Sequence, residues 1–243
     1  MSGLGAYHGQ LFWVYCLRLG LMATVVPALL AAGRPVSLVR AAAGPSASSR
    51  VEAFLESRPA RALASPLIAP VVVPVLFAVV LFTPLFVATL RHDLLDQTVL
   101  LVVLAVSVVV MLPVVGDGAE ATSLSIGLGV LIGIGELILD ALPGLAVRLN
   151  SGLLGASDWG GVRRPWGPSP ARDQHIGGDV LWVLAELIDL PFLLVLAVRW
   201  VRADAREAKV VDRRLDESTG GDGPEMMTPW WLTEKPGRYD PPR

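Results

Sequence analysis

The sequence predicts an all-α fold, a polytopic membrane bundle of about five transmembrane helices, each of about 20 residues. Two observations lead to this prediction. Hydrophobic residues make up 53% of the 243 residues and charged residues only 17%, whereas a soluble domain carries about 25% charged residues. The few charges are also unevenly spread, so that they leave long apolar runs between them. This apolar content excludes intrinsic disorder for most of the chain.

Three other classes of protein are disfavoured. Cys16 is the single cysteine, which excludes a disulfide scaffold. The net charge of −2 provides no basic surface for nucleic acid, so we expect no nucleic-acid partner. The sequence contains no G-x-S-x-G, Walker A or H-E-x-x-H motif, so it does not indicate an enzyme.

Five apolar segments account for the predicted spans. The first is apolar apart from Arg18, the second and third carry no charge, the fourth carries two acids, and the fifth carries two acids between Val180 and Val198. Their predicted bounds are 11–32, 65–90, 97–115, 121–147 and 179–201. The first segment lacks a preceding basic region and a following A-x-A-like site, so we expect it to be a helix of the bundle, not a cleaved signal peptide. Residues 1–201 would form the bundle and residues 202–243 a partly disordered cytoplasmic tail.

The arginines predict the orientation, because short cytoplasmic loops are enriched in Lys and Arg. Two basic regions, the loop after the first helix and the tail after the fifth, are separated by four helices and so lie on the same face. We assign that face to the cytoplasm. Their basic residues are Arg34, Arg40, Arg50, Arg58 and Arg61 in the loop, and Arg199, Arg202, Arg206, Lys209, Arg213 and Arg214 in the tail. We therefore expect a multi-pass protein of the bacterial plasma membrane with its N-terminus outside and its C-terminus inside. In the basic loop, residues 51–56 form a short amphipathic piece suited to the inner membrane interface.

Ionisable side chains inside the predicted spans form a candidate polar cluster: Arg18, Glu136, Asp140, Glu186 and Asp189. Such groups are costly in hydrocarbon and usually face the interior of a bundle. Three interpretations remain open, namely a cluster that fixes helix packing, a path for protons or metal ions, and snorkelling to an interface. Because Arg18 and Glu186 lie at similar depth, we predict an ion pair between them.

Small residues in the fourth span predict close helix packing. Gly129 and Gly133 form a G-x-x-x-G pattern, which lets two membrane helices approach closely.

Histidine and sulfur side chains provide a candidate copper site. The predicted topology places His8, His92 and His175 at the outer surface, with Cys16 below His8. Imidazole and thiolate ligands suit copper, so copper is the candidate cofactor. The alternative is three interfacial histidines that bind no metal.

Asp173 and Gln174 stand just before the glycine pair Gly177–Gly178. This order predicts an irregular start to the fifth helix, where polar side chains satisfy free helix N–H groups.

The stretch 173–216 resembles the last helix of the CtaG-like cytochrome c oxidase assembly factors, especially the actinobacterial form. That family shows a D-Q-x-x-G-G motif, a following Trp and Glu, and a W-x-R-x-D-x-R-E-A ending. In this chain these fall on Asp173, Gln174, Gly177, Gly178, Trp182, Glu186, Trp200, Arg202, Asp204, Arg206, Glu207 and Ala208. Weaker matches upstream, at Pro27, Gly33, Pro35, Pro84 and the Leu112–Gly116 ending, extend the resemblance over most of the chain.

The resemblance implies a membrane assembly factor for a haem–copper respiratory oxidase, with oxidase subunits as partners and a role in copper delivery. The chain diverges from the family at the family's histidines. Their positions hold other residues here: Tyr15, Leu19, Phe82, Asp96 and Leu100. The alternatives are a small ion or metal transporter that uses the intramembrane acids, and a metal-free membrane scaffold or interaction protein.

Overall fold

The computed structural model describes residues 7–33, 38, 42, 45–65, 67–115, 123–156 and 165–218. Within these ranges every regular element is a helix. In chain order the helices are α2 (Phe12–Ala23), α3 (Val25–Ala32), α5 (Pro45–Leu55), α6 (Arg58–Leu63), α7 (Ala69–Phe82), α8 (Leu85–Arg91), α9 (Asp93–Val115), α10 (Ser123–Leu149) and α11 (Pro170–Ser218).

The predicted all-α membrane bundle is confirmed. Four segments of the described chain are long and apolar enough to cross a membrane: Phe12–Ala32, Asp93–Leu112, Ile126–Leu149 and Pro170–Glu217. The bent pair of α7 and α8 makes a fifth if it is counted as one span. The tail beyond residue 218 lies outside the described residues, and the orientation of the bundle stays a prediction.

The second span is a broken helix, where the sequence predicted one segment over 65–90. α7 and α8 meet at an angle of 66°. The break falls at Thr83, whose extended backbone (φ −112°, ψ 169°) is the conformation that the following Pro84 favours. The Thr83 hydroxyl donates to the Val79 carbonyl (2.6 Å) and accepts from the Leu85 N–H (3.2 Å), so it satisfies groups that the break leaves free.

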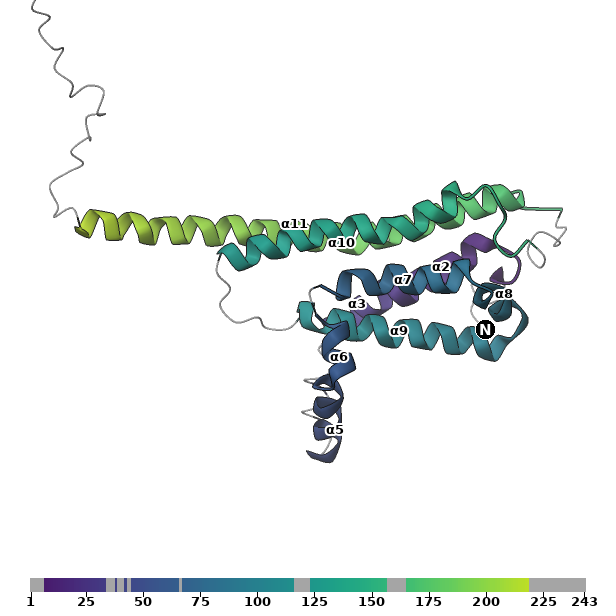
Figure 1. The fold of residues 1–243 in the computed structure, drawn as a ribbon, viewed down its shortest axis with the longest axis horizontal. Coiled ribbons are helices and arrows are strands. Elements are labelled where there is room, and N and C mark those ends of the chain that lie inside the picture. Colours follow the sequence, from purple (N-terminus) through teal and green to yellow (C-terminus); the bar gives the residue numbers. More distant parts are fainter. Residues whose placement is uncertain are drawn as a thin grey trace, which may run out of the picture.

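The helices stack from one side of the bundle to the other (Figure 1). α10 and α11 run antiparallel as a long pair across α2 and α7, and α9 lies on the far side of these. The buried core lies between α2, α7, α8, α9 and the first half of α11; its larger members are Phe12, Tyr15, Leu19, Phe77, Leu81, Phe86, Leu100 and Leu181. We call the end of the bundle where α2 and α11 begin and α10 ends the hub end, and the opposite end the far end.

The backbones of α10 and α11 approach each other closely at Gly144 and Gly178. A Cβ on Gly178 would lie 2.6 Å from the Gly144 carbonyl oxygen, and a Cβ on Gly144 would lie 2.6 Å from the Gly178 oxygen. Gly129 and Gly133 also face α11, but they meet the tips of the Leu196 and Leu193 side chains at 3.5 and 3.0 Å. Gly129 and Gly133 therefore lie against side-chain tips of α11 and not against its backbone, and their importance for helix packing stays a prediction.

The glycine pair yields a first prediction. We expect Gly178→Ala to destabilise the protein by about 1–3 kcal/mol, the usual cost of overpacking, because its Cβ would meet backbone atoms that cannot move aside. Gly135→Ala is the matched control, since a Cβ at Gly135 meets no atom within 4 Å. Thermal unfolding of the purified protein in detergent measures both variants. Equal midpoints for the two would contradict the close approach.

α11 is longer than the predicted span of 179–201. It begins at Pro170 and continues without a break to Ser218. Most side chains after residue 199 are exposed, and in Figure 1 this part of α11 extends beyond α10. Residues 202–218 are rich in Ala, Arg, Glu, Lys and Leu, which are strong helix formers, so the helix continues beyond α10.

Candidate functional site

Asp173 joins the first and last helices of the bundle at the hub end. Its side chain is fully buried. One carboxylate oxygen accepts the N–H of Phe12 and the other accepts the N–H of Trp13, both at 3.1 Å. These are the first two N–H groups of α2, which have no partner within their own helix. Asp173 therefore caps α2 from α11, and its negative charge also suits the positive end of the α2 dipole.

Gln174 binds the end of α10. Its side-chain nitrogen lies 3.3 Å from the carbonyls of Val147 and Asn150 and 3.1 Å from that of Gly152, to which it donates. Its side-chain oxygen accepts the N–H of Leu154 at 2.8 Å. This one amide satisfies backbone groups where α10 ends and the following turn begins.

Gly177 lets α2 pack directly on α11. A Cβ there would lie 2.5 Å from Phe12 Cδ1 and 3.0 Å from the Cys16 sulfur. Together with Gly178 against Gly144, the D-Q-x-x-G-G motif holds three helices at one point. We call Asp173, Gln174, Gly177 and Gly178 the hub. The predicted irregular start to the helix is wrong, because α11 already begins at Pro170 and the hub side chains satisfy groups of other helices.

A second buried site lies between α2 and α9. Arg18 Nη2 and Asp96 Oδ2 are 2.7 Å apart, and the Asp96 side chain is only 3% exposed. His8 Nε2 lies 3.9 Å from the same oxygen. In the described part of the chain, Arg18 Nη1 is buried without a hydrogen-bond partner. Nearby on α2, the Tyr15 hydroxyl shares a hydrogen bond with the Thr89 hydroxyl (3.0 Å).

The predicted ion pair between Arg18 and Glu186 is wrong. Arg18 pairs with Asp96, and Glu186 instead accepts a hydrogen bond from Trp182 Nε1 of its own helix at 2.9 Å. The sequence did contain a signal for Asp96. It is the last acid before the charge-free run of α9, and the up-and-down order of the helices places it at the depth of Arg18.

The four intramembrane acids do meet, between α10 and α11. Asp140 interacts electrostatically with Glu136, Glu186 and Asp189. The predicted polar cluster is thus divided into an acidic group of four and a separate Arg18–Asp96 pair.

The candidate copper ligands lie apart. His92 and His175 are exposed, Cys16 is fully buried in the core, and His8 faces Asp96. Among the described residues, which include all three histidines and the cysteine, no three His, Cys, Asp or Glu side chains form a group that could hold a metal ion. The residues present therefore do not fit a preformed copper site.

The positions where the resemblance places histidines come together in this structure as a packed region. Tyr15, Leu19 and Leu100 belong to the buried core, and Asp96 lies beside them, paired with Arg18. Phe82 is separate from them and 41% exposed. Aromatic and aliphatic side chains and one ion pair fill the region between α2 and α9.

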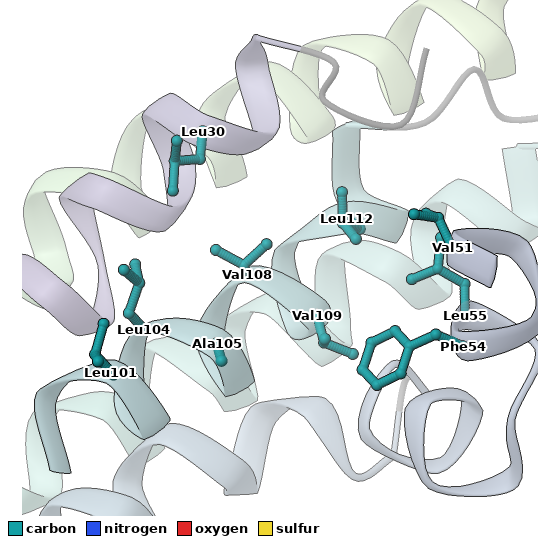
Figure 2. Close-up of a pocket in the computed structure, with 10 residues that line it drawn as sticks. All are labelled: Leu30, Val51, Phe54, Leu55, Leu101, Leu104, Ala105, Val108, Val109 and Leu112. Atoms are coloured by element: carbon teal, nitrogen blue, oxygen red, sulfur yellow. The ribbon is translucent and has the colours of Figure 1, made fainter. Parts of the chain in front are cut away.

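An apolar pocket of about 460 Å³ lies towards the far end, between α3, α5 and α9 (Figure 2). Val51, Phe54 and Leu55 form the apolar face of α5 and line one side, which agrees with the amphipathic pattern predicted there. All the described residues that line it are apolar, so the pocket suits apolar groups such as lipid chains.

These features define a polytopic membrane protein whose sites join helices to one another. Residues 1–203 match the family of cytochrome c oxidase caa3 assembly factors, and the chain belongs to that family. The resemblance predicted from the hub motif is confirmed.

Curated relatives come from mycobacteria, and each is named only as an uncharacterised protein. Those of Mycobacterium bovis and Mycobacterium tuberculosis are 29% identical to this chain over 230 residues, and that of Mycobacterium leprae is 27% identical. The matches cover 91% of this chain but 34–35% of the relatives, so the chain spans about a third of their length. No solved structure matches the chain.

Proposed function

We propose that this chain is a non-catalytic assembly factor of the bacterial plasma membrane that acts on subunits of a haem–copper respiratory oxidase through protein contacts. The observation that carries the proposal is the family match over residues 1–203. The sites support it, because the hub and the buried ion pair position helices and present no arrangement typical of catalysis.

The proposal further holds that the chain works without copper bound at the family's histidine positions. A buried guanidinium repels a metal cation, and Arg18 occupies the region where three of those positions converge. Asp96, the carboxylate there that could bind a metal, already pairs with Arg18. Copper delivery by such a site would require this pair to open.

Deletion of the gene tests the proposal. We expect the amount of assembled haem–copper oxidase to fall several-fold, with haem spectra and oxygen consumption as the measurements. Because the chain does not deliver copper in this proposal, added copper should not restore activity, and the copper content of membranes should fall only in proportion to the oxidase. Rescue by copper would instead favour delivery, and unchanged oxidase would contradict the assembly role.

The acidic group between α10 and α11 favours a second candidate, a small ion transporter. Ionisable residues within membrane spans often mark ion or proton paths, and Asp189 Oδ2 has no hydrogen-bond partner among the described residues. A transporter predicts loss of an ion flux with intact oxidase assembly, the opposite pattern in the same deletion strain.

A further inference from the structure

The part of α11 beyond the bundle carries a straight row of basic side chains. Its members are Arg199, Arg202, Arg206, Lys209 and Arg213, which we call the basic ladder. Their spacing of three and four residues places them within about 80° of the helix circumference, at 3.6 residues per turn. All five side chains are exposed. Of the described acids on this segment, Asp204, Glu207, Asp212 and Asp216 fall outside that arc, and Glu217 lies on it, one turn beyond the last ladder residue.

The ladder continues the face of α11 that α2 covers inside the bundle. The residues of α11 that contact α2 or lie buried beneath it repeat at intervals of three and four residues: Asp173, Gly177, Leu181 and Leu184. Continuing the same spacing along α11 reaches Arg199, so the ladder lies on the same face. α2 ends at Ala23 and α3 ends at Ala32, so no described helix covers this face further along (Figure 1). No ion pair of any ladder residue is found among the described residues.

The enrichment of basic residues next to cytoplasmic membrane ends explains how many positive charges occur here, but not their alignment. Like charges three or four residues apart repel one another on a helix. The ladder contains four such neighbouring pairs in succession, so its residues together form a surface that an opposite charge would stabilise.

The geometry favours a protein over a lipid surface as the source of the opposite charge. α11 is one helix through and beyond its spanning part, so the ladder rises along the membrane-crossing axis. From Arg199 to Arg213 it covers about 21 Å at 1.5 Å per residue. That is about twice the Debye length of 8–10 Å at physiological salt, so a lipid surface at its base would leave the last residues unneutralised.

We infer that the basic ladder is a docking surface for an acidic helix of a partner protein, with Asp or Glu repeating at the same three- and four-residue spacing. The partner helix would occupy, beyond the far end, the side of α11 that α2 occupies within the bundle. This inference goes beyond the proposed function and does not require the partner to be an oxidase subunit.

Two peptides of equal composition test the inference on the full chain in phosphatidylcholine nanodiscs. One peptide carries Glu at alternating three- and four-residue spacing, and the other carries the same residues in scrambled order. We expect the ordered peptide to bind at least about ten-fold more tightly, a difference of about 1.4 kcal/mol, with an affinity that falls as salt rises. Fluorescence anisotropy measures both affinities.

Matched variants locate the binding. Changing Arg206, Lys209 and Arg213 to Gln should lower the affinity for the ordered peptide to that for the scrambled peptide. The control changes Arg58, Arg61 and Arg214 to Gln, which removes the same charge outside the ladder, and should leave the preference intact. Equal binding of the two peptides, or equal loss in both variants, would overturn the inference.

A separate experiment tests whether lipid covers the ladder. It introduces Val210→Cys beside the ladder and measures the rate at which a charged maleimide labels this cysteine. We expect its labelling rate to be the same in phosphatidylcholine and in phosphatidylglycerol nanodiscs. Protection in the anionic nanodiscs would identify lipid as the occupant and would also overturn the inference.

Discussion

Arg18→Leu should destabilise the protein by about 3–5 kcal/mol, the usual cost of removing one partner from a buried ion pair. The cause is Asp96, whose carboxylate is 3% exposed and would lose its cation at 2.7 Å. His8, at 3.9 Å from the same oxygen, is too distant to replace a direct ion pair. Chemical unfolding in detergent and the amount of protein in the membrane are the measurements.

The double variant Arg18→Leu with Asp96→Leu is the decisive comparison. Replacing both ions by apolar residues is often neutral or stabilising, and here the neighbours are the buried core residues Leu19 and Leu100. We therefore expect the double variant to be more stable than Arg18→Leu alone. A double variant as damaged as the sum of the single variants would exclude the coupling. Glu186→Leu serves as the control, because the hydrogen bond of Glu186 is to Trp182 of its own helix.

Asp173→Ala should cost about 3 kcal/mol or more, since two hydrogen bonds to a charged acceptor contribute about 1.5–3 kcal/mol each. The change leaves the N–H groups of Phe12 and Trp13 without their acceptor. Asp173→Asn should be intermediate, because its amide keeps one acceptor oxygen. Thermal unfolding of the purified protein measures the series.

Asp179→Ala is the control for that series. Asp179 pairs with Arg148, but both side chains are 45% exposed, and exposed ion pairs contribute about 0–1 kcal/mol. A midpoint for Asp173→Ala equal to that of Asp179→Ala would contradict the role of Asp173 as the cap of α2.

The sequence was sufficient for the fold because a spanning helix is encoded locally, in the length of an apolar run. It also identified Asp173 and Gln174 as side chains that satisfy free backbone groups. Which groups they satisfy could not be predicted, because those belong to α2 and α10 and depend on how three helices assemble. The same limit applies to Arg18, whose depth follows from the sequence but whose neighbouring helix does not.

The glycines illustrate the other gap. A G-x-x-x-G pattern indicates a helix face without side-chain bulk, and Gly129 and Gly133 do face α11. The depth of the contact depends on the residues opposite, which are leucines there and Gly178 opposite Gly144. The close contact at Gly144 and Gly178 uses one glycine from each of two helices. It therefore leaves no repeated spacing within either helix, and a motif read from one helix cannot predict it.

The unbroken length of α11 has a mechanical consequence. Forty-nine helical residues form a rod of about 74 Å at 1.5 Å per residue, more than twice the thickness of the hydrocarbon core. The rod packs against α2 and α10 from Asp173 to about Leu196, and its last turns extend beyond α10 (Figure 1). A tilt of the α10–α11 pair by about 5° at the hub would displace the tip of α11 by about 6 Å over that length. A small rearrangement at the hub end would therefore produce a larger displacement at the opposite end of α11.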